Sequence, residues 1–235
     1  MTRLPAARAA LESLAARHAE LAAAGQADPR LPSSWRFARP DPAGLRHAAV
    51  LILFGRLDDQ PAHNPHEVVP EDLDVLFVQR ADTLRQHAGQ VAFPGGKVDP
   101  GDDGAIGAAL REAEEETGLD PAGVDVIGEL NETELPVSNF LVTPVLGWWA
   151  RPSAVGVVDP GESAHVFRVP VADLLDARHR VSAVVVRGEN RYASPAFSVD
   201  DTPLIWGFTA IVLSRLFDEL GWTLPWDATR ELRVN

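Results

Sequence analysis

The sequence predicts an α/β protein in which a mixed β-sheet lies between helices. Short apolar runs typical of buried strands alternate along the chain with stretches of helical periodicity. Apolar residues make up 46% of the 235 residues, which is enough for a packed core. Because strands and helices interleave instead of forming separate blocks, we expect helices to cover the sheet.

The elements can be assigned in order along the chain. Residues 5–24 are rich in helix formers and predict a helix, whereas residues 25–44 are rich in Pro and Gly and predict irregular structure. Strands are expected at 48–54, 73–78, 124–130, 139–149 and 165–169, with helices at 104–117, around 170–176 and at 204–220, and a hairpin of 181–186 with 191–198.

We divide the chain into three parts. Residues 1–44 form an N-terminal helix and Pro/Gly-rich segment, residues 45–222 form the main domain, and residues 223–235 form a tail. The N-terminal helix is a candidate for homodimer formation, but we favour its packing on its own domain.

Composition limits the function. The formal net charge of −13 argues against broad nucleic-acid binding, which requires clustered Lys and Arg. An anionic small molecule stays compatible, because a local basic patch and a metal can overcome the mean field. The chain has no cysteine, which excludes thiolate metal sites. No apolar run reaches transmembrane or secretory length, so we expect no membrane partner and a cytoplasmic location.

The acidic stretch at residues 112–116 is the main candidate for chemistry. On a helix, Glu112, Glu115 and Glu116 share one face, and like charges at this spacing repel each other. A bound divalent cation would turn this repulsion into ligation, and carboxylate oxygens suit a hard ion such as Mg²⁺ or Mn²⁺. Arg111 lies four residues before Glu115, so a helix salt bridge could hold that acid. The alternative is a solvated acidic helix face.

The ends of this helix are also marked in the sequence. Asp102 or Asp103 can cap its start, and Gly118 can end it in the left-handed conformation. Before the helix, the Gly95–Gly96 pair allows the backbone to approach a ligand closely.

This stretch resembles the signature of the Nudix hydrolases, G-x5-E-x7-R-E-U-x-E-E-x-G-U, in which U is a bulky apolar residue. Six residues match the second half of the signature: Arg111, Glu112, Glu115, Glu116, Gly118 and Leu119. Asp102 stands where Glu is usual, and the run from Asp102 to Arg111 is one residue longer than the pattern. The resemblance implies an α/β/α Nudix sandwich and metal-dependent hydrolysis of a phosphoanhydride.

A second motif lies in residues 75–96. It resembles the extra motif of one Nudix branch, the coenzyme A pyrophosphatases, roughly L-L-T-x-R-x4-R-x3-G-x3-F-P-G-G. Seven residues fit this motif: Arg80, Arg85, Gly89, Phe93, Pro94, Gly95 and Gly96. That branch also tends to carry Asp with the longer spacing at position 102. The resemblance covers roughly residues 45–220.

The residues and the resemblance together suggest roles in a site. Glu112, Glu115 and Glu116 are the expected metal ligands and catalytic acids. The resemblance adds Glu162, from a downstream loop, as a base or further ligand. Arg80 and Arg85 suit phosphate groups, with Gly95 and Gly96 beside them, because guanidinium binds phosphate bidentately. Phe140 could stack on adenine, although core packing is an equal alternative.

The expected reaction is hydrolysis of the pyrophosphate bond of coenzyme A or its thioesters, which yields 3′,5′-ADP and a 4′-phosphopantetheine species. Two alternatives stay open. The substrate could be ADP-ribose or another nucleoside diphosphate derivative, or the chain could be a Nudix-fold sensor that binds a nucleotide without turnover. The complete set of three glutamates argues against the sensor.

Overall fold

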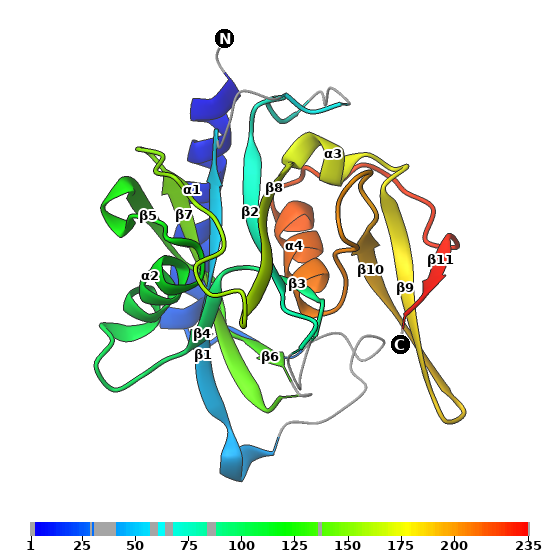
Figure 1. Ribbon diagram of the computed structural model, residues 1–235, viewed down its shortest axis with the longest axis horizontal. Coiled ribbons are helices and arrows are strands. Elements are labelled where there is room, and N and C mark those ends of the chain that lie inside the picture. Colours follow the sequence, from blue (N-terminus) through cyan, green and yellow to red (C-terminus); the bar gives the residue numbers. More distant parts are fainter. Residues whose placement is uncertain are drawn as a thin grey trace.

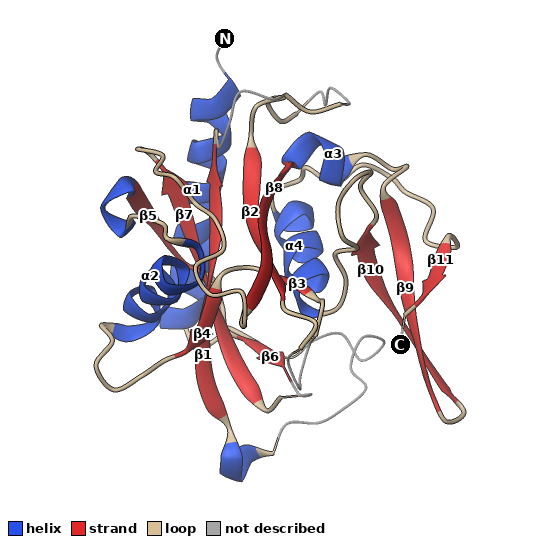
Figure 2. Cartoon of the chain, in the orientation of Figure 1, coloured by secondary structure: helices blue, strands red, loops and turns tan. Residues whose placement is uncertain are grey.

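The computed structural model describes residues 3–28, 30, 41–56, 61–63, 68–83, 88–135 and 138–234. These residues form two β-sheets and four α-helices (Figures 1 and 2). The larger sheet contains β1 (Arg46–Gly55), β2 (Asp74–Arg80), β3 (Val91–Ala92), β4 (Gly95–Lys97), β5 (Val124–Glu129), β6 (Thr133–Leu135), β7 (Phe140–Trp149) and β8 (Ser163–Pro170).

The larger sheet is mixed. Its central pair, β1 and β7, is parallel over nine residue pairs, whereas β5 and β6 join β7 in antiparallel orientation. β1 and β2 pair only at Phe54–Val75 and Gly55–Asp74. Nearer the start of β1, at residues 48–50, β4 pairs with it instead of β2. β3 and β8 pair with β2. The sheet therefore consists of two groups of strands that meet at one end of β1 (Figure 1).

Helices cover both faces of this sheet because β1 is apolar on both sides. Leu51 and Leu53 pack with the buried alanines of α2 (Gly104–Thr117). Ile52 and Phe54 belong to a larger cluster on the other face. That cluster contains residues of α1 (Arg3–Ala23), α3 (Val171–Leu175) and α4 (Phe208–Glu219). The alternation of side chains along a strand thus produces the layered arrangement that the sequence predicts.

The smaller sheet consists of β9 (Arg180–Arg187), β10 (Asn190–Phe197) and β11 (Glu231–Arg233). β9 and β10 form the expected hairpin, and β11 runs parallel to β9 on its other edge. α4 lies between the two sheets (Figure 1), where the Phe217 ring meets the Phe197 ring edge-on at 6.2 Å between centroids. The hairpin is therefore not part of the central sheet, and residues 231–233 of the expected tail are paired to it.

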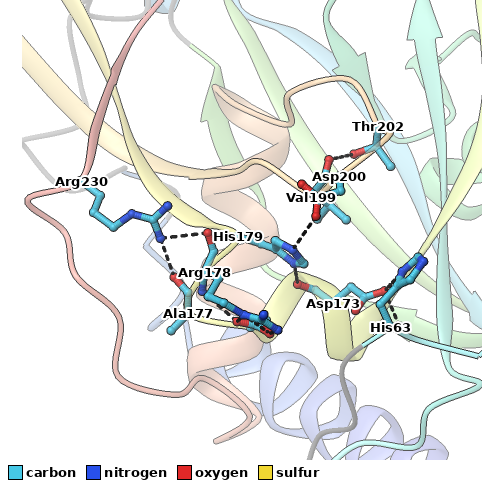
Figure 3. Close-up of polar contacts among 10 residues, drawn as sticks. His63, Asp173, Ala177, Arg178, His179, Val199, Asp200, Thr202 and Arg230 are labelled. Atoms are coloured by element: carbon cyan, nitrogen blue, oxygen red, sulfur yellow. Dashed lines mark hydrogen bonds and ion pairs between the residues drawn. The ribbon is translucent and has the colours of Figure 1, made fainter.

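A polar network connects α3 to the smaller sheet (Figure 3). His179 Nδ1 donates a hydrogen bond of 2.7 Å to the carbonyl oxygen of Asp173. The Asp173 carboxylate accepts from the backbone N–H of His63 at 3.1 Å. Arg230 donates to the carbonyl oxygens of Ala177 and Arg178 at 3.1 and 2.9 Å. These contacts fix the C-terminal segment next to the corner between α3 and β9.

Most expected elements occur within two residues of their predicted bounds, with two corrections. The closing helix begins at Phe208 rather than at 204, because Ile205 forms a β-bridge with Phe197 before the helix starts. The expected side-chain cap of α2 is also absent. Asp103 occupies the N-cap position without a capping hydrogen bond, and the Asp102 carboxylate binds Arg111 instead.

α1 contributes Ala7, Leu11 and Leu14 to the core cluster that it shares with α4. The boundaries at residues 44 and 222, and the possibility of a homodimer, stay predictions. Among the described residues, no helix is both long and apolar enough to cross a lipid bilayer. Two short 3₁₀ helices, η2 (Pro42–Gly44) and η3 (Pro121–Gly123), precede β1 and β5.

Candidate active site between α2 and the Gly95–Gly96 strand

α2 spans the residues that its sequence pattern predicts. Ala108, Ala109 and Ala113 are buried against the sheet, so the helix is fixed through its apolar face. Gly118 ends the helix in the left-handed conformation, with φ of 71°, and its N–H binds the carbonyl oxygen of Glu114. A residue with a Cβ would be strained there. The acidic residues are thereby held at the edge of the sheet.

Glu116 lies against β4. Its carboxylate accepts a hydrogen bond of 3.1 Å from the backbone N–H of Gly95, which lies opposite Val50 in the pairing of β4 with β1. Burial, together with the nearby negative charges of Glu112 and Glu162, raises the pKa of Glu116 to about 7. A Cβ at Gly95 would lie 2.3 Å from the carbonyl oxygen of Ala49, so only glycine allows this close pairing of β4 with β1.

Glu112 lies over the next residue of β4. A Cβ at Gly96 would stand 2.4 Å from the carboxyl carbon of Glu112, so the absence of a side chain there provides the space for that carboxylate. Glu112 is half-buried, and this burial raises its pKa. The two glycines that the sequence singles out therefore have distinct functions: Gly95 allows strand pairing, and Gly96 accommodates Glu112.

Arg111 connects α2 to the loop before it. Its guanidinium donates to both oxygens of Asp102 at 2.8 and 3.0 Å and to the carbonyl oxygen of Lys97 at 3.1 Å. It also contacts Glu112 at 3.0 Å and Glu115 at 3.1 Å. Arg111 holds the pKa of Asp102 at about 2, well below its usual value. The expected Arg111–Glu115 pair is present, and Asp102 acts as an anchor for Arg111.

Arg80 and Glu162 approach from the other group of strands. The backbone N–H of Ala81 donates 2.9 Å to the carbonyl oxygen of Glu162, next to the pairing of Arg80 with Ser163. Arg80 acts on Glu116 electrostatically and lowers its pKa, opposing the effect of burial. The buried Nε of Arg80 has no hydrogen-bond partner in the structure. A cation with an unused donor thus lies near the buried acids.

A divalent cation fits part of this donor set. No three carboxylate or histidine side chains among the described residues converge closely enough to hold a metal ion. Glu115 is exposed and binds Arg111, whereas Glu112 and Glu116 face β4. These two acids provide hard oxygen donors whose raised pKa values show that protein cations compensate their charge incompletely. A metal would supply the missing compensation.

The remaining predicted residues lie elsewhere. Phe140 begins β7, and the guanidinium of Arg46 covers its ring, with 4.1 Å between Cζ and the ring centre. Arg85 lies outside the described residues. Sequence reasoning did not single out Arg46, because an arginine at the start of a strand has no distinguishing pattern.

Comparisons with known proteins identify the family. A family model described as the NUDIX domain matches residues 66–187, just over half of the chain. The chain therefore belongs to the Nudix family. A protein from Shigella flexneri named "Uncharacterized Nudix hydrolase NudL" is 36% identical over 196 residues, covering 81% of this chain and 93% of that protein. NudL of Escherichia coli strain K12 is 39% identical over 177 residues, covering 75% and 83%.

Solved structures of Nudix proteins also match. The Nudix hydrolase RenU of M. smegmatis covers 77% of this chain and 89% of its own, at 20% identity and a TM-score of 0.45. The NUDIX domain of Shewanella oneidensis NrtR, complexed with ADP ribose, covers 57% and 80%, at 22% identity and a TM-score of 0.40.

Proposed function

We propose that this chain is a metal-dependent hydrolase that cleaves the pyrophosphate bond of coenzyme A or its thioesters, giving 3′,5′-ADP and a 4′-phosphopantetheine species. The observation that supports hydrolysis most directly is the pair of partly buried acids, Glu112 and Glu116, beside β4. Two carboxylates with raised pKa values are unfavourable for folding. They are useful if a substrate-associated cation completes the site.

The residues take distinct roles in this proposal. Glu112 and Glu116 would hold Mg²⁺ or Mn²⁺, which would neutralise phosphate oxygens and lower the pKa of a bound water. Glu115 is the third predicted ligand, and its contact with Arg111 places it on the solvent side of the pair. Arg111 positions the acids by tying them to Asp102 and to the backbone of Lys97.

Glu162 and Arg80 would act on the substrate from the β2–β8 side. The Glu162 side chain is exposed while its backbone is fixed to Ala81, so it can accept a proton from water as a general base. Arg80 would bind a phosphate oxygen through its guanidinium. Arg85 is proposed as a second phosphate ligand on the basis of its sequence motif alone.

The choice of coenzyme A rests on the motif at residues 75–96. The acids and Arg80 alone suit any substrate with a pyrophosphate group, so ADP-ribose or another nucleoside diphosphate derivative is the second candidate. The site of a nucleotide sensor would have no need of two buried acids without a full complement of protein cations. For this reason we favour hydrolysis over binding without turnover.

A substrate panel tests the proposal. The purified protein is incubated with Mg²⁺ or Mn²⁺ and, in separate reactions, coenzyme A, ADP-ribose and a dinucleoside polyphosphate, with EDTA controls. Chromatography should show metal-dependent release of 3′,5′-ADP from coenzyme A at the highest rate. Faster cleavage of another substrate would replace coenzyme A in the proposal. Tight nucleotide binding without cleavage of any substrate would favour the sensor.

A further inference from the structure

Arg46 and Phe140 form a fixed stack at the start of the central strand pair. The two residues are partners in the parallel β1–β7 ladder, and the Arg46 Cζ lies 4.1 Å from the centre of the Phe140 ring. Nη2 of Arg46 donates 2.7 Å to the carbonyl oxygen of Ser138. This is the only hydrogen bond that the guanidinium makes to the described part of the chain, and Arg46 is exposed to solvent.

The backbone around the stack is held in place by polar contacts. Asn139 adopts the left-handed conformation, with φ of 57°, and its carbonyl oxygen accepts from the N–H of Arg46 at 3.1 Å. The Asn139 amide also binds the backbone of Asp41 twice, at 2.7 and 3.1 Å. A side chain on such a frame loses little conformational freedom when it binds a ligand, which favours affinity.

The surroundings of Arg46 are aromatic and lack a paired acid among the described residues. No carboxylate among the described residues forms an ion pair with Arg46, although the chain carries a net charge of −13. His47, the next residue, pairs with Glu132 at 3.4 Å, whereas Arg46 is paired with an aromatic face. A planar guanidinium with open N–H edges is well suited to bind a phosphate bidentately.

The position of the stack relates it to the candidate active site. Ala49 pairs with Gly96, the residue under Glu112, and Arg46 lies three residues before Ala49 on β1. At about 3.3 Å per residue this separation is roughly 10 Å along β1, and because side chains alternate, Arg46 lies on the face of the sheet away from α2, whereas Ala49 faces α2. β4 pairs with β1 along one edge, so a substrate whose pyrophosphate lies at Glu112 and Glu116 would reach Arg46 by passing the other edge of β4.

We propose that Arg46, supported by Phe140, binds the ribose 3′-phosphate of the substrate and thereby distinguishes coenzyme A from nucleotides without this group. The inference rests on the proposed function and deepens it. Because the guanidinium covers one face of the Phe140 ring, Phe140 serves as a platform for Arg46, and direct stacking of adenine on that face is excluded.

Kinetics with two matched substrates test the role of Arg46. Coenzyme A and 3′-dephospho-coenzyme A differ only in the 3′-phosphate. Arg46→Ala should raise KM for coenzyme A about tenfold or more, because a charged hydrogen-bonded contact is lost. KM for the dephospho form and both kcat values should change less than twofold. The KM of Arg46→Lys for coenzyme A should lie between the values of the wild type and Arg46→Ala. Phe140→Leu should also reduce the preference for coenzyme A over its dephospho form.

The exposed Arg233→Ala change in β11 provides a matched control and should leave both substrates unaffected. If Arg46→Ala raises KM equally for the two substrates, or changes neither KM, the ratio of the two KM values is unchanged and the proposal is overturned. An equal rise would make Arg46 a structural residue. Thermal melting of each variant separates these results from loss of folding.

A binding measurement keeps this inference independent of the proposed reaction. Calorimetry should show that the wild-type protein binds 3′,5′-ADP about tenfold more tightly than 5′-AMP, and that Arg46→Ala abolishes this difference. If coenzyme A is not cleaved but the difference is present, the reaction is wrong and the phosphate site is retained. If coenzyme A is cleaved and the wild-type protein shows no difference, the Arg46 proposal fails alone.

Discussion

Two regions of this protein bury a charge without a full partner, and they do so in opposite ways. In the candidate active site, Glu116 is largely buried and its pKa is raised to about 7. At the start of β9 in the smaller sheet, Arg180 is only 1% exposed, and burial lowers its pKa to about 10. Both groups lose hydration, but their neighbours differ.

Arg180 is enclosed by the protein. Its Cζ lies 4.7 Å from the centre of the Phe197 ring and 4.8 Å from that of Trp226, and Nη2 donates 2.8 Å to Ser214. Nε and Nη1 have no hydrogen-bond partner and no contact with solvent. The aromatic faces compensate part of the charge through cation–π attraction. Among the described residues, only the Gly95 N–H donates a hydrogen bond to Glu116, and no aromatic ring covers its carboxylate there.

The difference shows how burial of a charge can serve packing or chemistry. Arg180 fills the space between two rings with its large side chain, and nothing in its surroundings can be exchanged for a ligand. Glu116 lies at the open edge of β4 with a second acid, a nearby Arg80 and glycines that provide space. The first charge is part of the core, whereas the second is a place where a cation can bind.

The largest expected change in stability is at Arg180. Arg180→Ala should lower the free energy of unfolding by about 3–5 kcal/mol, because it opens a cavity between Phe197 and Trp226. Arg180→Met keeps the volume and removes the charge, so its stability should stay within about 1 kcal/mol of wild type or rise. Urea denaturation measures both. A loss in Arg180→Met as large as in Arg180→Ala would show that the charge itself is essential.

Glu116→Gln should lower the activity of the protein but raise its stability. Hydrolysis should fall about a hundredfold or more, because a metal ligand is lost. The metal-free protein at pH 8 should become more stable by up to about 3 kcal/mol, since the shift from 4.5 to about 7 reflects an unfavourable buried charge. Steady-state rates and denaturation with EDTA test both effects. Wild-type turnover in the variant would refute the site assignment.

The pH dependence of stability should distinguish the buried charge of Glu116 from that of Arg180. A carboxylate with a raised pKa contributes stability below its unfolded value of 4.5, and this contribution is lost as pH rises through about 7. The melting temperature of the metal-free protein should therefore fall between pH 5 and 8 more steeply than that of Glu116→Gln. Arg180, with a pKa of about 10, should give no slope in this range. Identical slopes in both proteins would assign the effect to other groups.

The smallest expected effect is that of a methyl group at Gly96. Its Cβ would stand 2.4 Å from the Glu112 carboxyl carbon, so Gly96→Ala should displace this side chain and reduce hydrolysis about tenfold. Stability should change by less than about 1 kcal/mol, because the displaced group is the end of a flexible side chain. Gly156→Ala, whose Cβ would meet nothing within 4 Å, is the control. Equal activity in the two variants would contradict the proposed position of Glu112.

The sequence determined the elements of this protein and the local contacts of the candidate site. Helical spacing placed α2 at residues 104–117 with Gly118 as its C-terminal cap, because both depend on local contacts. The Arg111–Glu115 pair and the β9–β10 hairpin followed from local spacing in the same way. Local rules also supported the expectation that strands and helices form layers.

Only the tertiary structure decided how distant segments meet. The separation of the hairpin into a second sheet depends on α4 and on β11, which lies more than forty residues after β9 in the chain. The placement of Glu112 and Glu116 against β4, and of Arg80 and Glu162 nearby, requires strands far apart in sequence to pair. The pKa values of the acids, the stack of Arg46 on Phe140 and the enclosure of Arg180 depend on burial and neighbours. Burial is a property of the packed chain, so no spacing of residues could have given it.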